Sequence, residues 1–300
     1  MAIKRRPLVV FVTIVLLLSL LSACASSGEQ DGAGASSPSR ANYIENKGSD
    51  TIVNLALAWA ELYQQQHADV SISVTGGGSG TGIASLLNGT VDIASASRAI
   101  TPGEIANANR VGIEPQEVII ARDAIAVIVN PSNPVQELTM QQISEIFQGN
   151  INNWREVGGE DLPIVRVSRE TNSGTHVYFL EEVVRLGDSD SHVIFAADTL
   201  LLPSSEGIIS EVGDNPHAIG YDGLGYVTSH VKVVGVAKEV GAEYVMPSVE
   251  TVNSGMYPIS RDLYMYTTQN PSPLTQTYLE WILSPEAQQI VVDLGFVPVK

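Results

Sequence analysis

The chain has 300 residues, 44% of them hydrophobic, and carries 33 acidic against 16 basic residues, a formal net charge of −17. A chain of this length can bury one large hydrophobic core or two of ordinary size. The acidic excess argues against a nucleic-acid partner, because proteins that bind nucleic acid carry basic stripes that neutralise its phosphates.

The first 23 residues are predicted to be a lipoprotein signal peptide. Basic residues at 4–6 precede an apolar stretch over 8–21. At about 14 residues, this stretch is shorter than the roughly 20 that a transmembrane helix needs. Small residues then lead into Cys24, as in the bacterial lipobox, so Cys24 is the predicted lipidation site. The alternative is an ordinary signal peptide or anchor with an incidental cysteine. Cys24 is the only cysteine of the chain, which excludes an intramolecular disulfide.

Residues 24–42 are rich in Ser, Gly and Ala and predict a flexible tether. Beyond it, apolar residues at helical spacing predict helices over residues 51–65, 83–87, 139–147, 175–186 and from 284 onward. Alternating or continuous apolar runs predict strands over residues 70–74, 90–94, 124–130, 164–167, 220–227, 231–236 and 257–266. The run over 124–130 is unbroken, which favours a strand covered on both faces, as in a parallel sheet. Strands that alternate with helices indicate an α/β fold with largely parallel sheets.

Proline and glycine positions predict two lobes with a cleft between them. Pro131 and Pro134 follow the strand at 124–130, and a Gly- and Pro-bearing stretch near 242–257 would return the chain. We therefore expect one lobe from residues 43–123 plus 246–300 and a second lobe from residues 124–245. Open α/β sheets bind ligands beyond the carboxyl ends of their strands.

Three turns of small and hydroxyl residues each precede a predicted helix. They are GSDT at 48–51, TGGGSGTGI at 75–83 and SGT at 173–175. A helix N-terminus offers free amides and the positive end of a dipole, so together the turns predict a site for a small tetrahedral anion. The glycine turn matches neither a Walker loop nor a GxGxxG fingerprint. Capping of each helix by its own residues, or a plain flexible turn, is the alternative at each position.

The candidate contacts in these turns share a hydroxyl, a carboxylate or an approachable amide. They are Ser49, Asp50, Thr51, Ser79, Gly80, Ser173, Gly174 and Thr175. Surface charges are screened beyond about 10 Å at ~0.1 M salt, so the net acidity of the chain does not prevent a buried anion from binding here.

Charged residues next to the turns extend the predicted site. Arg169 precedes the third turn, and its planar guanidinium can donate to two oxygens of an anion. Asp92 lies at the end of the strand predicted at 90–94, six residues before Arg98. An aspartate there could accept the proton of monohydrogen phosphate, which sulfate lacks. The alternatives are a structural Asp92–Arg98 ion pair and a surface role for Arg169.

Several segments together resemble the phosphate-binding lipoproteins of ABC phosphate importers. They are VDIASASR, GGGSGTGI, the Arg-x-x-x-Ser-Gly-Thr arrangement at 169–175, INNWREVGG at 151–159 and AIGYDGLGYV at 218–227. The resemblance runs in order over nearly all of residues 43–300. It implies a type II periplasmic-binding-protein-like fold, α/β and two-lobed, with the ligand cleft between the lobes.

The resemblance also implies inorganic phosphate as ligand and the membrane permease subunits of an ABC phosphate importer as partners. It implies a monomer that is lipid-anchored to the outer face of the cytoplasmic membrane or lies in the periplasm. The implied contacts are Ser49–Thr51, Ser79, Asp92, Arg169, Ser173, Gly174 and Thr175. Asp50 touches the ligand or caps its own helix, and Arg98 contacts phosphate or supports Asp92.

Enzyme functions have little support in the sequence. The five histidines are scattered without metal-ligand spacing, the alternating residues at 188–192 favour a solvated turn, and GxSxG is absent. We expect neither metal nor cofactor. Two alternatives stay open: a binder of another oxyanion such as sulfate or molybdate, and a secreted phosphate-ester hydrolase. The hydrolase would need a nucleophile–base pair or a metal cluster.

Overall fold

The computed structural model describes residues 42–299. The predicted signal peptide, the lipidation site Cys24 and nearly all of the predicted tether lie outside these residues. Among the helices it describes, none combines the length and the apolar character needed to cross a membrane.

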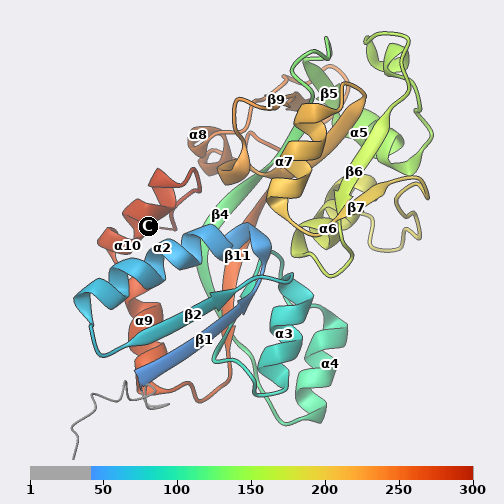
Figure 1. Cartoon of the computed structure of the whole chain (residues 1–300). Coiled ribbons are helices and arrows are strands. Elements are labelled where there is room, and N and C mark those ends of the chain that lie inside the picture. The colour runs from blue at the N-terminus through green and yellow to red at the C-terminus, as the bar shows by residue number, and fades with distance from the viewer. Residues whose placement is uncertain (1–41, 300) are drawn as a thin grey trace, which may run out of the picture. The chain divides into compact units, whose positions relative to one another are not determined.

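The described chain alternates strands and helices, which confirms the predicted α/β class (Figure 1). The elements up to residue 110 are β1 (Tyr43–Gly48), α2 (Asp50–Gln66), β2 (Ser71–Thr75), α3 (Ser79–Leu87), β3 (Ile93–Ala96) and α4 (Pro102–Arg110). Next come β4 (Gln116–Val129), β5 (Glu137–Thr139), α5 (Met140–Gln148), η2 (Trp154–Val157), β6 (Val165–Arg169), α6 (Gly174–Phe179), the π-helical turn η3 (Leu180–Val184), β7 (Leu200–Leu202) and α7 (Ser205–Asp214). The last are β8 (Ala218–Gly223), η4 (Leu224–Tyr226), β9 (Lys232–Val233), β10 (Gly235–Ala237), α8 (Val249–Asn253), β11 (Ser260–Thr267), α9 (Pro273–Ile282) and α10 (Pro285–Asp293).

One mixed sheet contains most of the strands, in the order β2-β1-β3-β11-β4-β8-β6-β7, with β9 also on β4, and β5 and β10 form a separate parallel pair. At one end β1 is parallel to β2 and β3, and at the other β6 is parallel to β7 and β8. Between them, β11 and β4 are antiparallel to all their neighbours. We call β2-β1-β3 the first half of the sheet and β8-β6-β7 the second half. Figure 1 shows β4 and β11 running between the two halves.

The burial of β4 agrees with the prediction, but its pairing is antiparallel and not parallel. Residues 124–130 are buried throughout, as the unbroken apolar run indicated. Alternate side chains enter different cores, Ile125 and Val127 on one side and Ala126 and Ile128 on the other. Cover on both faces therefore explains the continuous pattern, and the inference of parallel pairing was wrong, because an antiparallel strand between two covered faces needs the same residues.

The cores show where the chain passes between the halves. Ile44, Trp59 and Leu263 share one cluster, which packs against the first half. Tyr257 and Ile259 pack instead with the cluster that includes Ile143, Phe179 and Tyr221. The predicted lobe limits stay a prediction, and this packing favours a return crossing near residue 260.

Local sequence explains two of the predicted helices. Helix α2 buries Ile52, Leu55, Ala56, Trp59 and Tyr63 at helical spacing, as predicted. Helix α10 begins as predicted, because the Ser284 side chain accepts the amide of Ala287 and Pro285 occupies its first turn.

Candidate anion-binding site

The three predicted turns meet in the structure. Helix α2 follows β1, α3 follows β2 and α6 follows β6, so each N-terminus lies at the carboxyl end of a parallel strand. Contacts between the turns, described below, join the helix ends of the first half to that of the second. The structure therefore brings the hydroxyl-bearing turns together, as the sequence indicated.

Close backbone packing holds the first two turns. The amide of Gly78 donates to the carbonyl of Gly48 at 2.9 Å, and the amide of Ser49 donates to that of Ser95 at 2.9 Å. Gly48 has φ +150°, and a Cβ there would lie 2.0 Å from the Ser95 oxygen. Only glycine fits this approach, so β1 can deliver the start of α2 directly against β3.

A pair of serines in the first half faces the start of α6. The Ser79 hydroxyl accepts the amide of Ser97 at 3.0 Å and lies 3.3 Å from the Ser97 hydroxyl. A methyl group at Gly174 would lie 2.3 Å from Ser79 Oγ and 2.6 Å from Ser97 Oγ. Glycine at the first position of α6 thus lets its backbone reach both hydroxyls.

Two threonines form a second contact between the first half and the start of α6. The hydroxyls of Thr51 in α2 and Thr175 in α6 lie 2.9 Å apart, and both residues are buried. Ser173 is the N-cap of α6, where its hydroxyl accepts the amide of Thr175 at 3.2 Å. Ser49 is also buried, but its side chain makes no capping bond to α2.

Arg169 ends β6 and is 1% exposed. Its Nη2 donates to Asp50 Oδ2 at 2.8 Å and to the carbonyl of Pro203 at 2.8 Å, and its Nη1 donates to Ser205 Oγ at 2.9 Å. Asp222 Oδ2 lies 3.7 Å from Nη1. This guanidinium is held by the second half of the sheet and reaches across to a carboxylate at the start of α2.

The Asp50 side chain does not cap α2 but contacts two other parts of the site. Its Oδ1 accepts the amide of Gly77 at 3.0 Å, while its Oδ2 pairs with Arg169. The side chain is 20% exposed, whereas Arg169 is fully enclosed. Asp50 therefore ties the glycine turn to the arginine of the other half.

Asp92 lies away from this cluster, which contradicts its predicted role. Its Oδ2 accepts the amide of Glu45 at 2.9 Å, before β3 begins at Ile93. Ser97, in contrast, follows the far end of β3. Five residues of extended chain separate it from Asp92, a distance of about 16 Å. The predicted strand at 90–94 was placed too early, so the aspartate at its expected end precedes the real strand.

Two other predicted contacts have different partners. Arg98 pairs with Glu104 through two 2.8 Å bonds, so the alternatives of an Asp92–Arg98 ion pair and of support for Asp92 are wrong. The amide of Gly80 donates to the carbonyl of Asn172 at 3.1 Å. Gly80 thus fastens the first half to the second.

Sequence reasoning missed five polar residues of the cluster, one of which is Ser205, bonded to Arg169 and Asp222. Ser97 and Asp222 lay inside segments already singled out, VDIASASR and AIGYDGLGYV, and Asp123 and Arg261 each stand in or next to an apolar strand run. Asp123 and Arg261 are opposite each other on β4 and β11, with 2.9 Å between Oδ2 and Nη2. Charged residues within buried strands were the available signal.

Burial sets the acidity of the two enclosed aspartates. It raises the pKa of Asp123 to about 6, although Arg261 opposes the shift. Burial likewise raises the pKa of Asp222, against the pull of Arg169. Each carboxylate keeps one oxygen without a hydrogen-bond partner among the described residues.

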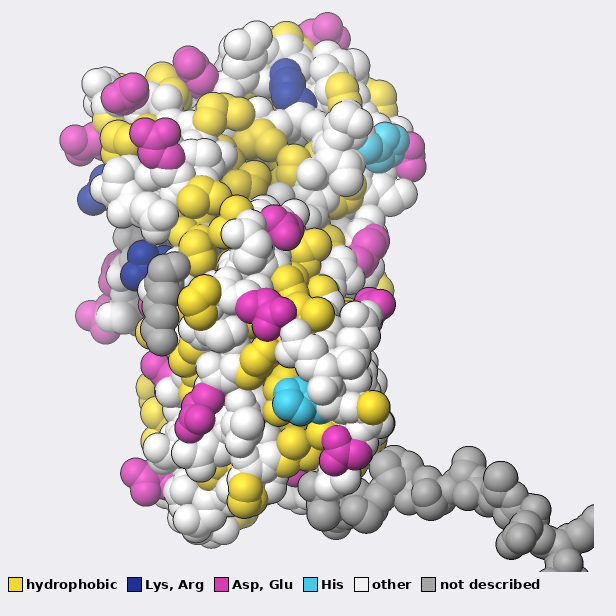
Figure 2. All heavy atoms as spheres, turned by 90° about the vertical axis from the view of Figure 1, so that its left-hand side faces the viewer, with side chains coloured by type: hydrophobic (Ala, Val, Ile, Leu, Met, Phe, Trp, Pro, Cys, Tyr) yellow, Lys and Arg dark blue, Asp and Glu magenta, His cyan; other side chains and the backbone are white. Residues whose placement is uncertain are grey.

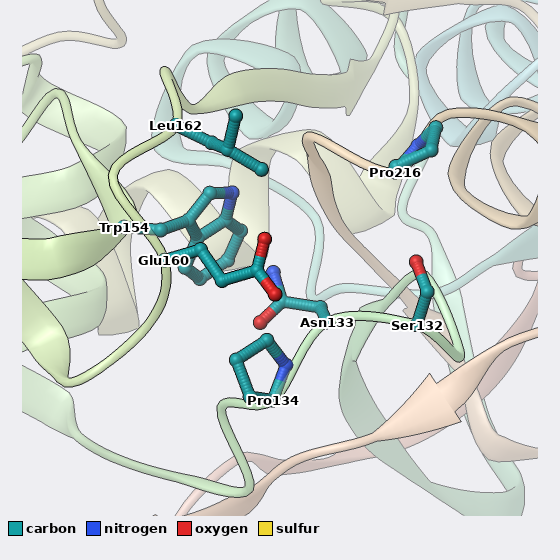
Figure 3. Close-up of a pocket in the computed structure, with 7 residues that line it drawn as sticks. All are labelled: Ser132, Asn133, Pro134, Trp154, Glu160, Leu162 and Pro216. Atoms are coloured by element: carbon teal, nitrogen blue, oxygen red, sulfur yellow. The ribbon is translucent and has the colours of Figure 1, made fainter.

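A separate pocket of about 120 Å³ lies elsewhere in the fold (Figure 3). It is lined by Ser132, Asn133, Pro134, Trp154, Glu160, Leu162 and Pro216. The indole N–H of Trp154 donates to the carbonyl of His217 at 3.0 Å, and its side chain belongs to a core cluster. The pocket offers no cation for an anion. Within residues 42–299, no group of three or more His, Cys, Asp or Glu is arranged to hold a metal ion.

Comparison with known proteins agrees with this arrangement. A family model described as a PBP superfamily domain matches residues 33–286. The phosphate-binding protein PstS of Pseudomonas aeruginosa is 32% identical, with 94% of each chain covered. PstS of Bacillus subtilis is 28% identical, over 99% of this chain and 95% of the relative.

Solved structures agree as well. A substrate-binding protein of Clostridium perfringens, assigned to a phosphate ABC transporter and solved with bound phosphate, is 34% identical with a TM-score of 0.77. The match covers 86% of this chain and all of that one. An ABC-type phosphate transport receptor of Vibrio cholerae is 30% identical with a TM-score of 0.68, over 85% and 99% of the chains. The chain belongs to the PBP superfamily and, within it, to the family of the PstS phosphate-binding proteins.

Proposed function

We propose that the protein captures inorganic phosphate outside the cytoplasmic membrane and delivers it to the permease of an ABC importer. The observation that carries the proposal is the meeting of three helix N-termini, with their hydroxyls, next to the buried Arg169, which pairs with Asp50 at the start of α2. The relatives named for phosphate binding or phosphate transport support the same ligand.

The hydroxyls supply the hydrogen bonds. Thr51 and Thr175 contact each other, and so do Ser79 and Ser97. A hydroxyl rotates freely and both donates and accepts, so each pair can turn toward an oxygen of a bound anion. Because the members of the threonine pair come from different halves, an anion held by both would draw the halves together.

Arg169 supplies the positive charge. It is buried and always ionised, and its planar donors match two oxygens of a phosphate. Acidic side chains, by contrast, are dispersed over the molecular surface, as the face in Figure 2 shows. The net charge of −17 is therefore compatible with an anion held beside Arg169, because distant surface charges are screened.

We assign the selectivity role to Asp50 in place of Asp92, which binds the backbone at Glu45 away from the cluster. It contacts Arg169 at 2.8 Å and keeps 20% of its side chain exposed. A protonated phosphate oxygen can donate to this carboxylate, whereas sulfate, which has no proton, would present only lone pairs to a negative charge. A binding site built around one such hydrogen bond rejects the analogue that lacks it by about 10⁴–10⁵-fold.

The proposal includes the anchor and the partners expected from the sequence. Lipidated Cys24 would hold a monomer at the outer face of the cytoplasmic membrane or in the periplasm, where the permease subunits receive phosphate. The protein acts by binding and not by catalysis. A site for sulfate or molybdate on the same fold is the second candidate, since hydroxyls and amides can solvate any tetrahedral oxyanion.

Calorimetric titration of purified, ligand-stripped protein tests the proposal. We expect one phosphate per chain with submicromolar affinity, about −8 kcal/mol or tighter, and no heat with sulfate. Binding of sulfate or molybdate in place of phosphate would transfer the function to the second candidate. Sustained turnover of a chromogenic phosphate ester would contradict a binding role.

A further inference from the structure

Arg261 occupies the place where the sheet changes from its first half to its second. Strand β4 pairs with β11 up to Ala124 and with β8 from Ile125 onward. Arg261 and Asp123 stand opposite each other next to this change of partner, on the two strands that run between the halves in Figure 1. Both are buried, with Arg261 6% exposed and Asp123 0%.

The guanidinium of Arg261 also contacts both threonines. Its Nη2 donates to Asp123 Oδ2 at 2.9 Å, to Thr175 Oγ1 at 3.0 Å and, more weakly, to Thr51 Oγ1 at 3.4 Å. One side chain of the connecting strands thus touches the N-terminal turns of α2 and α6 together. Its Nη1 has no hydrogen-bond partner among residues 42–299 although it is buried, and a buried donor of this kind is costly unless something accepts it.

Neighbouring residues fix the orientation of this guanidinium. The ring of Tyr178, in α6, lies 5.5 Å from Arg261 Cζ, and its hydroxyl donates to the carbonyl of Ser260 at 2.6 Å. At the end of β8, a Cβ at Gly223 would lie 2.8 Å from Asp123 Oδ2, so glycine leaves room for the carboxylate that holds Arg261. Arg261 also lines a cavity of about 380 Å³ whose walls include Arg98 and Glu182.

From these contacts we infer that Arg261, held by Asp123, positions the hydroxyls of Thr51 and Thr175 for the bound anion and links anion binding to closure of the two halves. The inference rests on the proposed function, because it concerns the same site. Arg261 acts through the threonines and is a positioning residue, whereas Arg169 is the cation that meets the ligand.

A double-mutant cycle tests this link. The variants are Arg261→Gln, Thr175→Val and the double variant, with Arg261→Lys to keep the charge without the planar donors. The measurements are the dissociation constant for inorganic phosphate, by calorimetry, and the thermal midpoint of the ligand-stripped protein. Arg166→Gln is the matched control, because Arg166 is also buried on a strand but bonds to Asp198 and the backbone at Ile151, outside the cluster.

We expect Arg261→Gln and Thr175→Val each to weaken phosphate binding at least about tenfold, and the double variant to be hardly weaker than either. Arg261→Lys should recover part of the affinity. Arg166→Gln should lower the thermal midpoint and leave the phosphate affinity unchanged.

Two results would overturn the inference: a lowered midpoint with unchanged phosphate affinity in Arg261→Gln, or strictly additive losses in the cycle. Failure of the wild-type protein to bind phosphate would overturn the proposed function instead. The cycle would then be measured with sulfate and molybdate, and non-additive losses with either would still support the role of Arg261.

Discussion

Arg169 and Asp50 lie 119 positions apart in the chain, yet their side chains meet at 2.8 Å. The pair joins a strand end of one half of the sheet to the first helical turn of the other. Because the arginine is buried and the aspartate is partly exposed, the pair defines an inner, cationic side and an outer, acidic side of the site.

Replacing Arg169 by Met should abolish tight phosphate binding. The change removes a planar cation and leaves Asp50 and Asp222 without their positive partner. Hydrogen bonds to charged groups contribute about 1.5–3 kcal/mol each, so we expect at least ~100-fold weaker binding by calorimetry. Arg155→Met is the control, because Arg155 forms an exposed ion pair with Asp161. This variant should bind phosphate with normal affinity. Normal affinity in the Arg169 variant would exclude Arg169 as the ligand cation.

Replacing Asp50 by Asn should narrow the preference for phosphate over sulfate. The amide has no negative charge to repel sulfate, so competition titrations should show the affinity ratio falling at least ~10-fold. Asp92→Asn should leave the ratio unchanged, because Asp92 binds the backbone at Glu45 outside the site. The reverse pattern would restore the role first assigned to Asp92.

A methyl group at Gly174 should disturb the site, because the atoms nearest to it belong to the polar side chains of Ser79 and Ser97. It would lie 2.3 Å from Ser79 Oγ and force the start of α6 away from the first half. Gly174→Ala should therefore weaken phosphate binding about tenfold or more, a cost in line with overpacking a tight contact. Gly103→Ala in α4 is the control, since the nearest atom to its Cβ is 4.0 Å away. Equal affinities for the two variants would show that the halves need not approach this closely.

The free energy of unfolding should depend on pH through Asp123. Its pKa rises from an ordinary 3.8 to about 6 on folding, so the native state binds a proton more tightly than the unfolded state between these values. The contribution of this carboxyl to the free energy of unfolding therefore falls as pH rises from about 4 to 6, by at most roughly 3 kcal/mol. Chemical denaturation of wild type and Asp123→Asn should show a stability difference, wild type minus variant, that is larger at pH 4 than at pH 7. A difference that grows with pH would mean that the pairing with Arg261 outweighs burial.

The proposed anchor has a direct test in cells. Cys24→Ser removes the only thiol of the chain, and with it the predicted lipid attachment. We expect the variant to leave the membrane fraction while keeping its phosphate affinity. Continued membrane association of the variant would point to retention by the apolar segment over 8–21.

The turns were predictable from sequence because their chemistry is local. Hydroxyls and glycines at the start of predicted helices identified the residues near Ser79 and Thr175, and the structure brings them together. Asp92 was misplaced because strand ends depend on pairing: Gly48 opposite Ser95 determines which residues of β3 face the site. The alternation of apolar residues in the sequence does not indicate how β3 is aligned with β1.

The pair formed by Asp123 and Arg261 was out of reach for a different reason. The two residues are 138 positions apart and meet only because β11 pairs with β4. No local pattern indicates which distant strand will be the neighbour, so a charged residue in an apolar strand is visible in the sequence but its partner is not.

The place of β11 in the sheet also determines when the protein can fold. This strand is made last, yet it lies between β3 and β4. A nascent chain that ends before residue 260 cannot complete its central pairing, so the contacts of Arg261 with Asp123, Thr51 and Thr175 form only after β11 has been synthesised.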